Sequence, residues 1–488
     1  MSAFLLKAVV VLSGAVLMSL EILGSRVLAP THGSSVYVWG SLITTFLAGL
    51  ALGYALGGRL ADRRPSLSLL SVILSGAAVL ILPAVVWAPG LLVRLAAAGW
   101  DVRWSSLAAA SLFFLPPSVA MGMVSPFAVR IAIRRVESAG SVAGAYSALS
   151  TGGSILGTLL TAFLLIPSFA VKDLLLVLGG TLALCALLLI RERASAWIAG
   201  AATLACGVAA AVQGPSPSIG GERLLLQRDT PYHHIAVTQL DRTRHLRFDN
   251  LPQSAVNLDH PERSVYVYDQ AFFLAFALRP AIQRVCMIGL GGAMFPRALA
   301  RLRPEAVIES VEIDPAVPQI ARDYFLYEES QNVRTVIEDG RVFLSRPGAP
   351  YDLIVLDAFN STGVPFHLTT REFFEAVVRR LTPDGVFAAN YIGRMMGREG
   401  RLFWASYQTI RRRFGQVYLV SGELASGKKD PWGNVILLAT VSADPVDSER
   451  IREAASALSA RWKLPLLPGF AGSLLHSPEP PAGTLELT

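Results

Sequence analysis

The first 213 residues are dominated by apolar stretches that are long enough to cross a lipid bilayer. A helix needs about 20 consecutive, mostly apolar residues to span the hydrocarbon core of a membrane. Seven stretches meet this requirement, at positions 4–29, 36–58, 67–88, 105–129, 141–166, 171–190 and 194–213. We therefore expect residues 1–213 to form a multi-pass helical membrane domain whose partner is the lipid bilayer.

Basic residues are distributed unevenly between the loops of this apolar half. Arginine clusters at 59–64, 130–135 and 191–193 follow the second, fourth and sixth stretches, and the loops between them are poorer in basic residues. Because loops rich in lysine and arginine usually face the cytoplasm, we expect these loops and the N-terminus to be cytoplasmic in the inner membrane of a cell. The N-terminal stretch has the single basic residue Lys7 and no small-residue cleavage site, so we expect it to be retained.

The seventh stretch is rich in alanine and glycine. It either spans the bilayer or lies at its interface. We favour the second arrangement, which keeps the C-terminal half of the chain in the cytoplasm. In the fourth stretch, Pro116 and Pro117 are expected to interrupt the helix, because proline lacks the backbone N–H that a helix uses.

Glycines recur at a spacing of four within two of the apolar stretches. They are Gly49, Gly53, Gly57, Gly153 and Gly157. Small residues at this spacing allow the backbones of two helices to approach closely. The pattern predicts closely packed helix pairs.

The two halves of the chain differ in charge. Residues 1–213 contain 13 Lys and Arg and 6 Asp and Glu, whereas residues 214–488 contain 30 of each kind. The net charge of +7 therefore belongs to the apolar half, and we expect no nucleic-acid partner. The three cysteines lie in apolar segments without metal-ligand spacing, so we expect neither a disulfide framework nor a metal site.

Turn-forming residues mark a domain boundary after the apolar half. Residues 214–221 read Gly-Pro-Ser-Pro-Ser-Ile-Gly-Gly and are expected to be a linker. Short segments at 224–227, 235–240 and 243–248 are typical of a meander of β-strands. Beyond them, 266–278 is expected to be helical, and alternating strand and helix patterns predict a doubly wound α/β domain.

Residues 284–314 carry the pattern strand, glycine turn, helix, strand. An apolar run at 285–288 leads directly into Gly289-Leu290-Gly291-Gly292, and a second apolar run at 307–313 contains Glu312 near its end. This order is a Rossmann-type βαβ unit. The glycines let the backbone approach a ligand, and an acid about 20 residues further on can bind both ribose hydroxyls. The segment therefore predicts a nucleoside-binding site.

Two further predicted strands also lead into acidic residues. The strand at 333–337 precedes Asp339 and Gly340, and the strand at 351–357 ends in Asp357. Ligands of a doubly wound sheet bind at the carboxyl ends of its strands. We therefore expect Glu312, Asp339 and Asp357 to line one cleft.

This constellation resembles the polyamine aminopropyltransferase (spermidine synthase) family, within the wider class of S-adenosylmethionine-dependent transferases. The resemblance covers about residues 220–400, and the apolar half resembles the multi-spanning regions fused to such domains in some bacteria. It implies a small N-terminal β domain over 222–262 and a Rossmann-like catalytic domain over 263–488. Because soluble members of the family assemble through their catalytic domains, it also implies a homodimer.

The nucleoside half of the family's site matches this chain. The positions that the resemblance assigns to cofactor binding are Gly289, Gly291, Gly292, Glu312, Asp339, Gly340, Gln253 and Pro365. By resemblance, the glycines form the loop beside the nucleoside, Glu312 holds the ribose and Asp339 lies beside the adenine. Asp357 falls where the family has its catalytic aspartate.

The amine half of the family's site departs from the pattern. Where the family has Gly-Gly-Gly-Asp, Gly292 replaces the acid, and where it has Asp-Ser-Ser-Asp, Asn360 replaces the second acid. Where it has Tyr-His-Glu, this chain reads Tyr268-Asp269-Gln270. A buried ammonium is costly without a carboxylate partner, and Asp269 is a candidate to replace one of the missing acids. The residues expected to contact the amine substrate are Tyr232, His233, Tyr268, Asp269 and Asn360.

The expected chemistry is displacement at a carbon attached to a sulfonium. The attacking amine must be neutral, and Asp357 is the expected general base that accepts its proton. The leading hypothesis is a membrane-bound transferase that moves an aminopropyl group from decarboxylated S-adenosylmethionine to an amine such as putrescine and releases methylthioadenosine. No metal is expected to take part.

Two alternatives remain open at the level of sequence. In the first, the same scaffold uses decarboxylated or intact S-adenosylmethionine to transfer an aminopropyl or methyl group to a lipid or another membrane-embedded acceptor. In the second, the chain is a transporter or sensor whose nucleoside-binding domain regulates it.

Overall fold

The computed structural model describes residues 3–481 except 34, 99, 134, 190–192, 213–217, 220, 250, 360–362, 394, 396–399 and 421–432, and it also describes residues 484 and 487. The chain divides into two compact units. The first comprises Met1–Ile219 and Gln227–Ile235, and the second comprises Gly220–Leu226 and Ala236–Thr488. Each unit is described by itself below.

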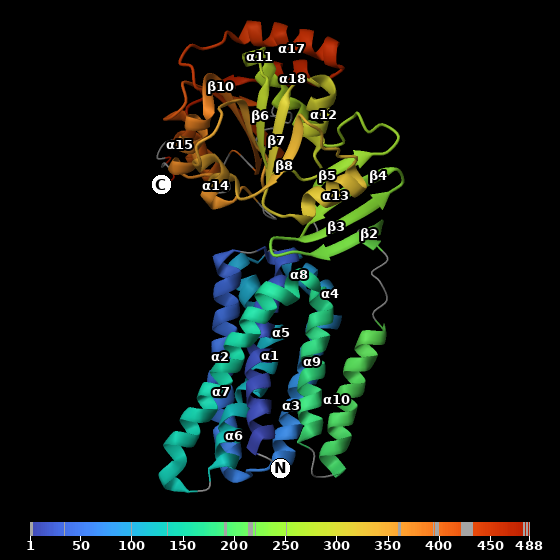
Figure 1. Ribbon diagram of the computed structural model, residues 1–488, viewed down its shortest axis with the longest axis vertical. Coiled ribbons are helices and arrows are strands. Elements are labelled where there is room, and N and C mark those ends of the chain that lie inside the picture. Colours follow the sequence, from blue (N-terminus) through green and yellow to red (C-terminus); the bar gives the residue numbers. More distant parts are fainter. Residues whose placement is uncertain are drawn as a thin grey trace. The chain divides into compact units, whose positions relative to one another are not determined.

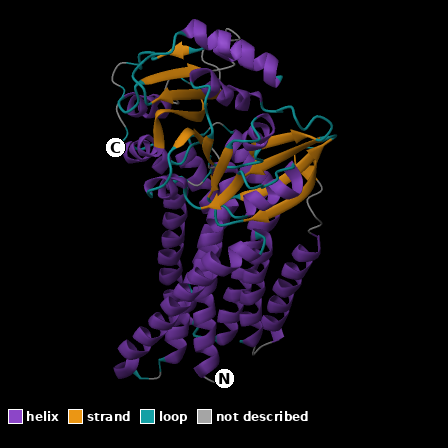
Figure 2. Cartoon of the chain, turned by 45° about the horizontal axis from the view of Figure 1, so that its top comes forward, coloured by secondary structure: helices purple, strands orange, loops and turns teal. Residues whose placement is uncertain are grey.

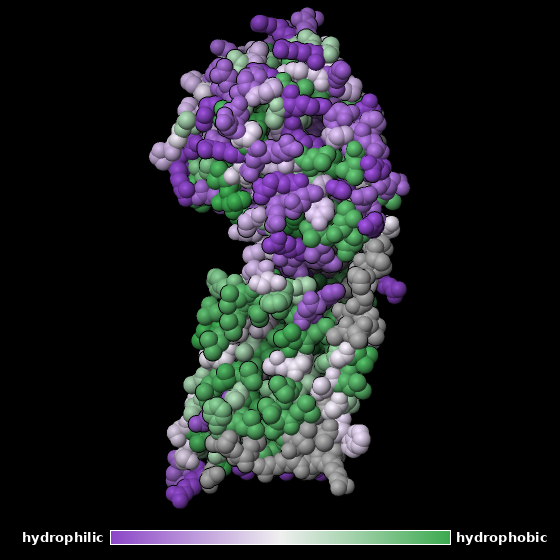
Figure 3. Space-filling view, turned by 45° about the vertical axis from the view of Figure 1, so that its right-hand side comes forward, coloured by the Kyte–Doolittle hydropathy of each residue, from purple (hydrophilic) through white to green (hydrophobic). Residues whose placement is uncertain are grey.

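The N-terminal part of the chain is helical (Figures 1 and 2). Its α-helices are α1 (Ala3–His32), α2 (Val36–Arg63), α3 (Leu67–Val86), α4 (Ala88–Ala97), α5 (Val102–Gly122), α6 (Val124–Ala132), α7 (Ala139–Leu160), α8 (Ile166–Ser168), α9 (Val171–Leu188) and α10 (Arg193–Val212). A 3₁₀ helix, η1 (Val136–Ser138), precedes α7, and a π-helical turn, η2 (Thr161–Leu165), follows it. Figure 3 shows apolar side chains gathered over these helices.

Within the residues that the structure describes, six helical segments are long and apolar enough to cross a membrane. They are Phe4–His32, Val36–Arg63, Leu67–Val86, Val102–Ala132, Val136–Ser168 and Val171–Leu188. These segments coincide with the first six predicted stretches. The seventh stretch forms α10, which is not among these six segments of the described residues, and its placement at the bilayer stays a prediction.

The fourth apolar segment also differs from its prediction. Helix α5 runs through Pro116 and Pro117 without a break and ends at Gly122, and α6 begins at Val124. The interruption expected at the two prolines is therefore wrong. Helix α5 packs against α2 and α3, and such neighbours can hold a proline-containing helix together.

Glycines bring two helix pairs into close contact, as their spacing predicts. A Cβ atom at Gly53 of α2 would lie 2.5 Å from the carbonyl oxygen of Val119 in α5. A Cβ atom at Gly153 of α7 would lie 2.0 Å from the carbonyl oxygen of Val11 in α1. Both distances are too short for any side chain, so these contacts between helices require glycine.

A five-stranded sheet follows the helical region, in the order β1-β2-β3-β4-β5. Its strands are β1 (Ser218–Ile219), β2 (Glu222–Asp229), β3 (His234–Leu240), β4 (Thr243–Phe248) and β5 (Leu251–Asn257). The meander pattern predicted β2, β3 and β4. Strand β5 pairs antiparallel with β4 and was not predicted.

The second sheet has eight strands in the order β13-β11-β12-β10-β9-β6-β7-β8. Its strands are β6 (Arg284–Ile288), β7 (Val307–Glu312), β8 (Val333–Ile337), β9 (Tyr351–Leu356), β10 (Leu381–Gly393), β11 (Gln416–Val420), β12 (Gly433–Thr440) and β13 (Leu475–His476). Strands β6 to β10 pair in parallel, whereas β12 pairs antiparallel with both β10 and β11. After β8 the chain returns to the other side of β6, so the strand order reverses between β6 and β9.

Helices lie on both faces of this sheet (Figure 1). They are η3 (Val267–Leu274), α11 (Ala275–Leu278), α12 (Met294–Leu302), α13 (Ala316–Phe325), α14 (Gly340–Ser345), η4 (Phe366–Leu368), α15 (Arg371–Arg380), α16 (Arg401–Arg411), α17 (Ser448–Trp462) and α18 (Leu467–Gly472). Phe373 and Tyr407, from α15 and α16, belong to one core cluster with β9 and β10. Phe273 stacks edge-on against Trp462 of α17 in a separate aromatic group.

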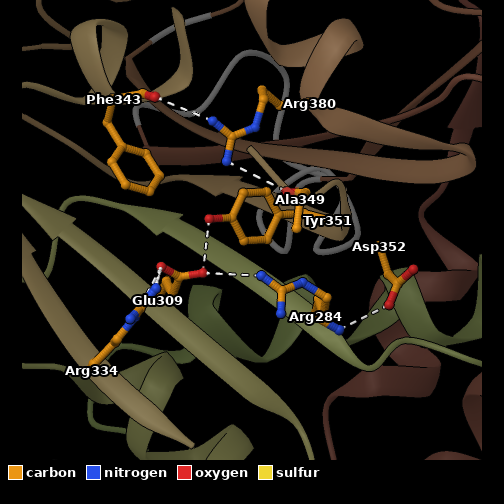
Figure 4. A network of polar contacts seen from close by, with 8 residues as sticks. All are labelled: Arg284, Glu309, Arg334, Phe343, Ala349, Tyr351, Asp352 and Arg380. Atoms are coloured by element: carbon orange, nitrogen blue, oxygen red, sulfur yellow. Dashed lines mark hydrogen bonds and ion pairs between the residues drawn. The ribbon is translucent and has the colours of Figure 1, made fainter. Parts of the chain in front are cut away.

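A buried polar network joins the first residues of the parallel strands (Figure 4). Glu309 of β7 is 3% exposed and accepts hydrogen bonds from Tyr351 Oη at 3.0 Å and Arg284 Nη2 at 3.3 Å. Arg334 of β8 completes the carboxylate's shell with Nε at 3.0 Å. Arg380 of α15 lies over the ring of Tyr351, with its Cζ 5.2 Å from the centroid. The arginines of this network pair with the charge of Glu309. The network lies toward the amino ends of the parallel strands, whereas the predicted cleft lies at their carboxyl ends.

Candidate functional site

The candidate site lies at the carboxyl ends of the strands where the strand order reverses, which is where ligands of a doubly wound sheet bind. Strands β6 and β9 are neighbours, and Gly289 and Asp357 are the residues that directly follow them. The amide of Asp357 donates to the carbonyl oxygen of Ile288 at 2.9 Å. A Cβ atom at Gly289, which has a φ of +90°, would lie 2.4 Å from the carbonyl oxygen of Asp357. Glycine is therefore needed for the two strand ends to meet.

The glycine turn is closed on its other side by β5. Gly292 donates its amide hydrogen to Ser254 Oγ at 3.0 Å. A Cβ atom at Gly292 would lie 2.8 Å from Ser254 Cβ and 3.2 Å from Phe325 Cδ1. The acid that the resemblance leads one to expect at position 292 thus has no room in this turn.

Glu312 supports the turn from the end of β7. It is 7% exposed, and its two carboxylate oxygens accept the amide hydrogens of Leu290 at 2.9 Å and Asp314 at 3.0 Å. Burial raises the pKa of Glu312, although these backbone hydrogen bonds oppose the rise. A carboxylate has about four lone-pair sites, so the Glu312 carboxylate retains acceptor capacity that a ribose hydroxyl can use.

Asp339 caps the helix that follows β8. Its Oδ1 accepts the amide hydrogen of Val342 at 3.0 Å, and its Oδ2 lies 2.9 Å from Nε2 of His367. Gly340 is packed so closely that a Cβ atom there would lie 2.4 Å from Ile288 Cγ2. Pro365 precedes η4 and accepts a hydrogen bond from the amide of Leu368 at 2.9 Å.

Asp357 is held by side chains from two other elements. Tyr268 Oη donates to Asp357 Oδ2 at 3.1 Å, and Asn390 Nδ2 donates to Asp357 Oδ1 at 2.9 Å. Burial raises the pKa of Asp357 to about 6, and the hydrogen bonds from Asn390 and Tyr268 restrain the rise. Burial, with the nearby carboxylate of Asp357, also raises the pKa of Tyr268 well above its usual value, so Tyr268 remains a hydrogen-bond donor. A carboxyl group with a pKa near neutrality can both accept and release a proton.

The sequence analysis missed Asn390 and the residue behind it. Asn390 has no exposed surface, and its own Oδ1 accepts a hydrogen bond from Asn434 Nδ2 at 3.0 Å. A signal existed for Asn390, because it directly follows the apolar run 386–389, and the carboxyl end of such a strand is where ligands bind. Asn434 lies on an antiparallel strand that no pattern linked to the site.

Asp269 lies beside this group in η3. It is 7% exposed, and its Oδ2 accepts a hydrogen bond from Ser264 Oγ at 2.7 Å. Burial raises the pKa of Asp269 to about 7; the bond from Ser264 lowers it, and the charge of Asp357 raises it further. Asp269 and Asp357 are therefore two carboxylates within electrostatic reach of each other.

For four other predicted contact residues, the assigned roles are not tested by the structure. Tyr232 is exposed and His233 is buried, and both belong to the segment Gln227–Ile235 of the first unit. Burial, followed by the charge of Arg26, lowers the pKa of His233 to about 4. Gln253 is part-buried and donates to the carbonyl oxygen of Leu251 at 3.4 Å. Asn360 lies outside the described residues. The assigned roles of these four residues stay predictions.

Among the described residues, no group of three or more His, Cys, Asp or Glu side chains is arranged to hold a metal ion. The site combines a glycine turn, a buried acid that can bind a diol, and two buried carboxylates. This arrangement can bind a nucleoside and accept a proton beside it.

Comparison with known proteins gives concordant matches for this half of the chain. The family model "Spermine/spermidine synthase domain" matches residues 273–399. A polyamine aminopropyltransferase of Vibrio vulnificus is 32% identical over 251 residues, which cover 50% of this chain and 80% of that protein. The polyamine aminopropyltransferase of Chromobacterium violaceum is 28% identical over 228 residues, which cover 46% of this chain and 82% of that protein.

Solved structures are also similar to the chain. A probable spermidine synthase from Corynebacterium glutamicum matches with a TM-score of 0.43 and 19% identity, covering 55% of this chain and 96% of that one. A spermidine synthase in complex with the transition-state analogue AdoDATO matches with a TM-score of 0.39 and 22% identity, covering 47% of this chain and 79% of that one.

Proposed function

Since the chain belongs to the polyamine aminopropyltransferase family and is a transferase, we propose that it is a membrane-bound enzyme that transfers an aminopropyl group from decarboxylated S-adenosylmethionine to a small amine such as putrescine. Methylthioadenosine is the second product. Its membrane attachment is supported by six apolar helices of spanning length among the described residues.

The observation that carries the proposed chemistry is the placement of Asp357. Its carboxylate stands at the end of β9, next to the glycine turn, and is fixed by Tyr268 and Asn390. In the proposed step, the lone pair of a neutral amine forms a bond to the aminopropyl carbon attached to sulfur. The carbon–sulfur bond breaks, its electron pair turns the sulfonium into a neutral thioether, and Asp357 accepts the proton that the amine loses.

The nucleoside part of the donor is assigned to the turn and its neighbours. Glu312 would hold the ribose hydroxyls, since it is a buried carboxylate at the end of β7. Gly289 and Gly291 leave the turn free of side chains, and both have positive φ angles, +90° and +53°. Asp339 and Pro365 are proposed to lie beside the adenine.

Calorimetric titration of the detergent-purified protein tests the donor. We expect decarboxylated S-adenosylmethionine and methylthioadenosine to bind, with intact S-adenosylmethionine weaker. The Asp357→Asn variant should lose about 100-fold or more in turnover with putrescine and still bind methylthioadenosine. Asp323→Asn, on the exposed side of α13, is the matched control and should keep full turnover. A preference for intact S-adenosylmethionine would refute aminopropyl transfer.

A second acceptor class is favoured by the same six helices, because a soluble diamine does not require a membrane. The candidate is an amine carried on a lipid or embedded in the bilayer. Turnover assays with putrescine and with an aminolipid in mixed micelles separate the two acceptors. Transfer to the aminolipid without transfer to putrescine would replace the leading proposal.

A further inference from the structure

Arginines gather at the ends of two long apolar segments. The pattern of one arginine, three other residues and two arginines occurs twice, at positions 59–64 and 130–135. The first copy lies at the end of the segment Val36–Arg63, and the second begins just before the end of the segment Val102–Ala132. Both segments are long and apolar enough to cross a bilayer, and arginines at the end of such a helix extend toward the lipid headgroups.

An ion pair joins the two copies of this pattern. Arg130 of α6 directs Nε to Asp62 Oδ1 of α2 at 3.1 Å. Arg59 lies three positions before Asp62, and Arg63 lies four positions after Arg59, so the three residues share one face of α2. The arginines of both helix ends therefore form one basic patch. Its described members are Arg59, Arg63, Arg64, Arg130 and Arg135, and Arg134 lies outside the described residues.

The basic patch has more positive charge than nearby acids neutralise. All of its described arginines are exposed. Positions 59–64 and 130–137 contain only two acids, Asp62 and Glu137. Arg130 is the one member of the patch that forms an ion pair within the described part of the chain. The other described members have their guanidinium groups available to an anion from outside the chain.

A phosphate group is the anion that fits this patch at the level of the headgroups. The planar guanidinium of arginine binds phosphate through two parallel N–H···O bonds. A zwitterionic headgroup brings its own cation next to the phosphate, so its net attraction to the patch is small. An anionic headgroup keeps a net negative charge, which clusters of arginine beside a spanning helix attract.

Resting on the membrane attachment within the proposed function, we propose that the basic patch binds the phosphate group of an anionic phospholipid. The bound phosphate lies against the exposed arginines of α2 and α6 and offsets their mutual repulsion. The Asp62–Arg130 pair keeps the two helix ends together, so that arginines from both helices can reach one headgroup.

Equilibrium binding of radiolabelled lipid in mixed micelles tests this proposal. We expect the wild-type protein to bind phosphatidylglycerol about 10-fold or more tightly than phosphatidylcholine, and this preference should weaken as the salt concentration rises. Replacing both Arg59 and Arg63 by glutamine should weaken the binding of phosphatidylglycerol about 10- to 30-fold, because each arginine near an anionic lipid contributes about fivefold. Unchanged affinity in this double variant overturns the proposal.

Two single variants separate a phosphate site from a general effect of charge. Arg94→Gln is the matched control, because Arg94 is an exposed arginine of α4 outside the patch, and it should leave the affinity unchanged. Arg63→Lys keeps the charge and loses the planar fork, so it should weaken binding by about 2- to 3-fold. An Arg94→Gln variant that loses as much affinity as the double variant overturns the proposal.

A further pair of variants covers a double variant that does not fold. Arg64→Gln and Arg135→Gln each remove one exposed member of the patch, and unchanged affinity for phosphatidylglycerol in both overturns the proposal. Glycerol phosphate is titrated as a soluble source of the same chemistry. Binding of glycerol phosphate as tight as that of the lipid overturns the lipid as the ligand.

Extraction of cell membranes with alkaline carbonate separates this inference from the function on which it rests. Protein that is released by carbonate overturns the proposed membrane attachment. Protein that stays in the membrane, yet binds phosphatidylglycerol no more tightly than phosphatidylcholine, overturns the lipid site alone. Turnover with putrescine tests the proposed reaction independently of both results.

Discussion

At the scale of single residues, the ionisation of Asp357 depends on hydrogen-bond donors that come from distant parts of the chain. Tyr268 lies 89 positions before Asp357, and Asn390 lies 33 positions after it. Both stabilise the ionised carboxylate and thereby oppose the effect of burial on its pKa. The proposed general base is active when ionised, so turnover should fall as the pH drops below about 6.

Replacing Asn390 tests this dependence. In Asn390→Ala the carboxylate loses a hydrogen bond that lowers its pKa, so the acid limb of the pH–rate profile should move to higher pH. We also expect kcat to fall about 10-fold, because the carboxylate loses its fixed orientation. Measuring kcat between pH 5 and 9 (roughly the range in which such groups titrate) checks both effects. Asn332→Ala is the control. It removes the hydrogen bond from Asn332 to the carbonyl oxygen of Pro304, which is not part of the proposed site, and it should change neither the pH–rate profile nor kcat. An unshifted profile would contradict the assignment.

Glu309 is expected to matter for stability instead of turnover. Glu309→Ala removes a buried carboxylate and leaves Tyr351 Oη without its acceptor, and we expect a loss of about 3 kcal/mol in the free energy of unfolding. Arg334→Ala removes an arginine whose side chain is 66% exposed, and it should cost less than about 1 kcal/mol. Denaturant unfolding followed by tryptophan fluorescence measures both variants. Equal losses of unfolding free energy in the two variants would show that the network depends on the exposed Arg334 as much as on the buried carboxylate of Glu309.

At the scale of elements, the close approach of α2 and α5 depends on glycine at defined positions. In Gly53→Ala the new methyl group would meet the carbonyl oxygen of Val119 at 2.5 Å and Gly122 Cα at 2.8 Å. Because both atoms belong to the backbone, the helices must separate, at a cost of about 2 kcal/mol.

Gly58 provides a control within the same helix, because a Cβ atom there meets nothing within 4 Å. Gly58→Ala should be neutral or stabilise the helix by up to about 1 kcal/mol. Thermal unfolding in detergent compares the two variants. If they behave alike, the contact at Gly53 does not hold α2 against α5.

At the scale of the whole molecule, the basic loops and the six described helices of spanning length predict the side of the membrane on which the C-terminal half lies. A chain whose N-terminus is cytoplasmic returns to the cytoplasm after six crossings. Green fluorescent protein fused after Leu188 and after Thr488 should therefore fluoresce in both fusions, and alkaline phosphatase at the same positions should be inactive. Opposite behaviour of the two fusion points would show that α10 crosses the bilayer.

The elements were predictable from the sequence because their signals are local. Apolar runs of spanning length indicated the six long helices, and the alternation of apolar runs with glycine turns indicated β6, β7, β8 and β9. The same local signals placed Glu312, Asp339 and Asp357 at strand ends, since an acid after an apolar run can be read directly. Local signals failed where packing overrides them, as at Pro116 and Pro117, which lie within α5.

Contacts between elements were decided by the tertiary structure alone. Strand order sets β9 beside β6 and β10 beside β9, and this order brings Asn390 to Asp357 and lets Gly289 touch the backbone of Asp357. Ser254 closes the glycine turn from β5, in the other sheet. Sequence periodicity specifies which face of a helix or strand is apolar. Which residues then lie beside each other on neighbouring strands depends on the order of the strands in the sheet. For this reason the sequence by itself predicted the nucleoside half of the proposed site, and only the fold decided which side chains hold Asp357 and Asp269.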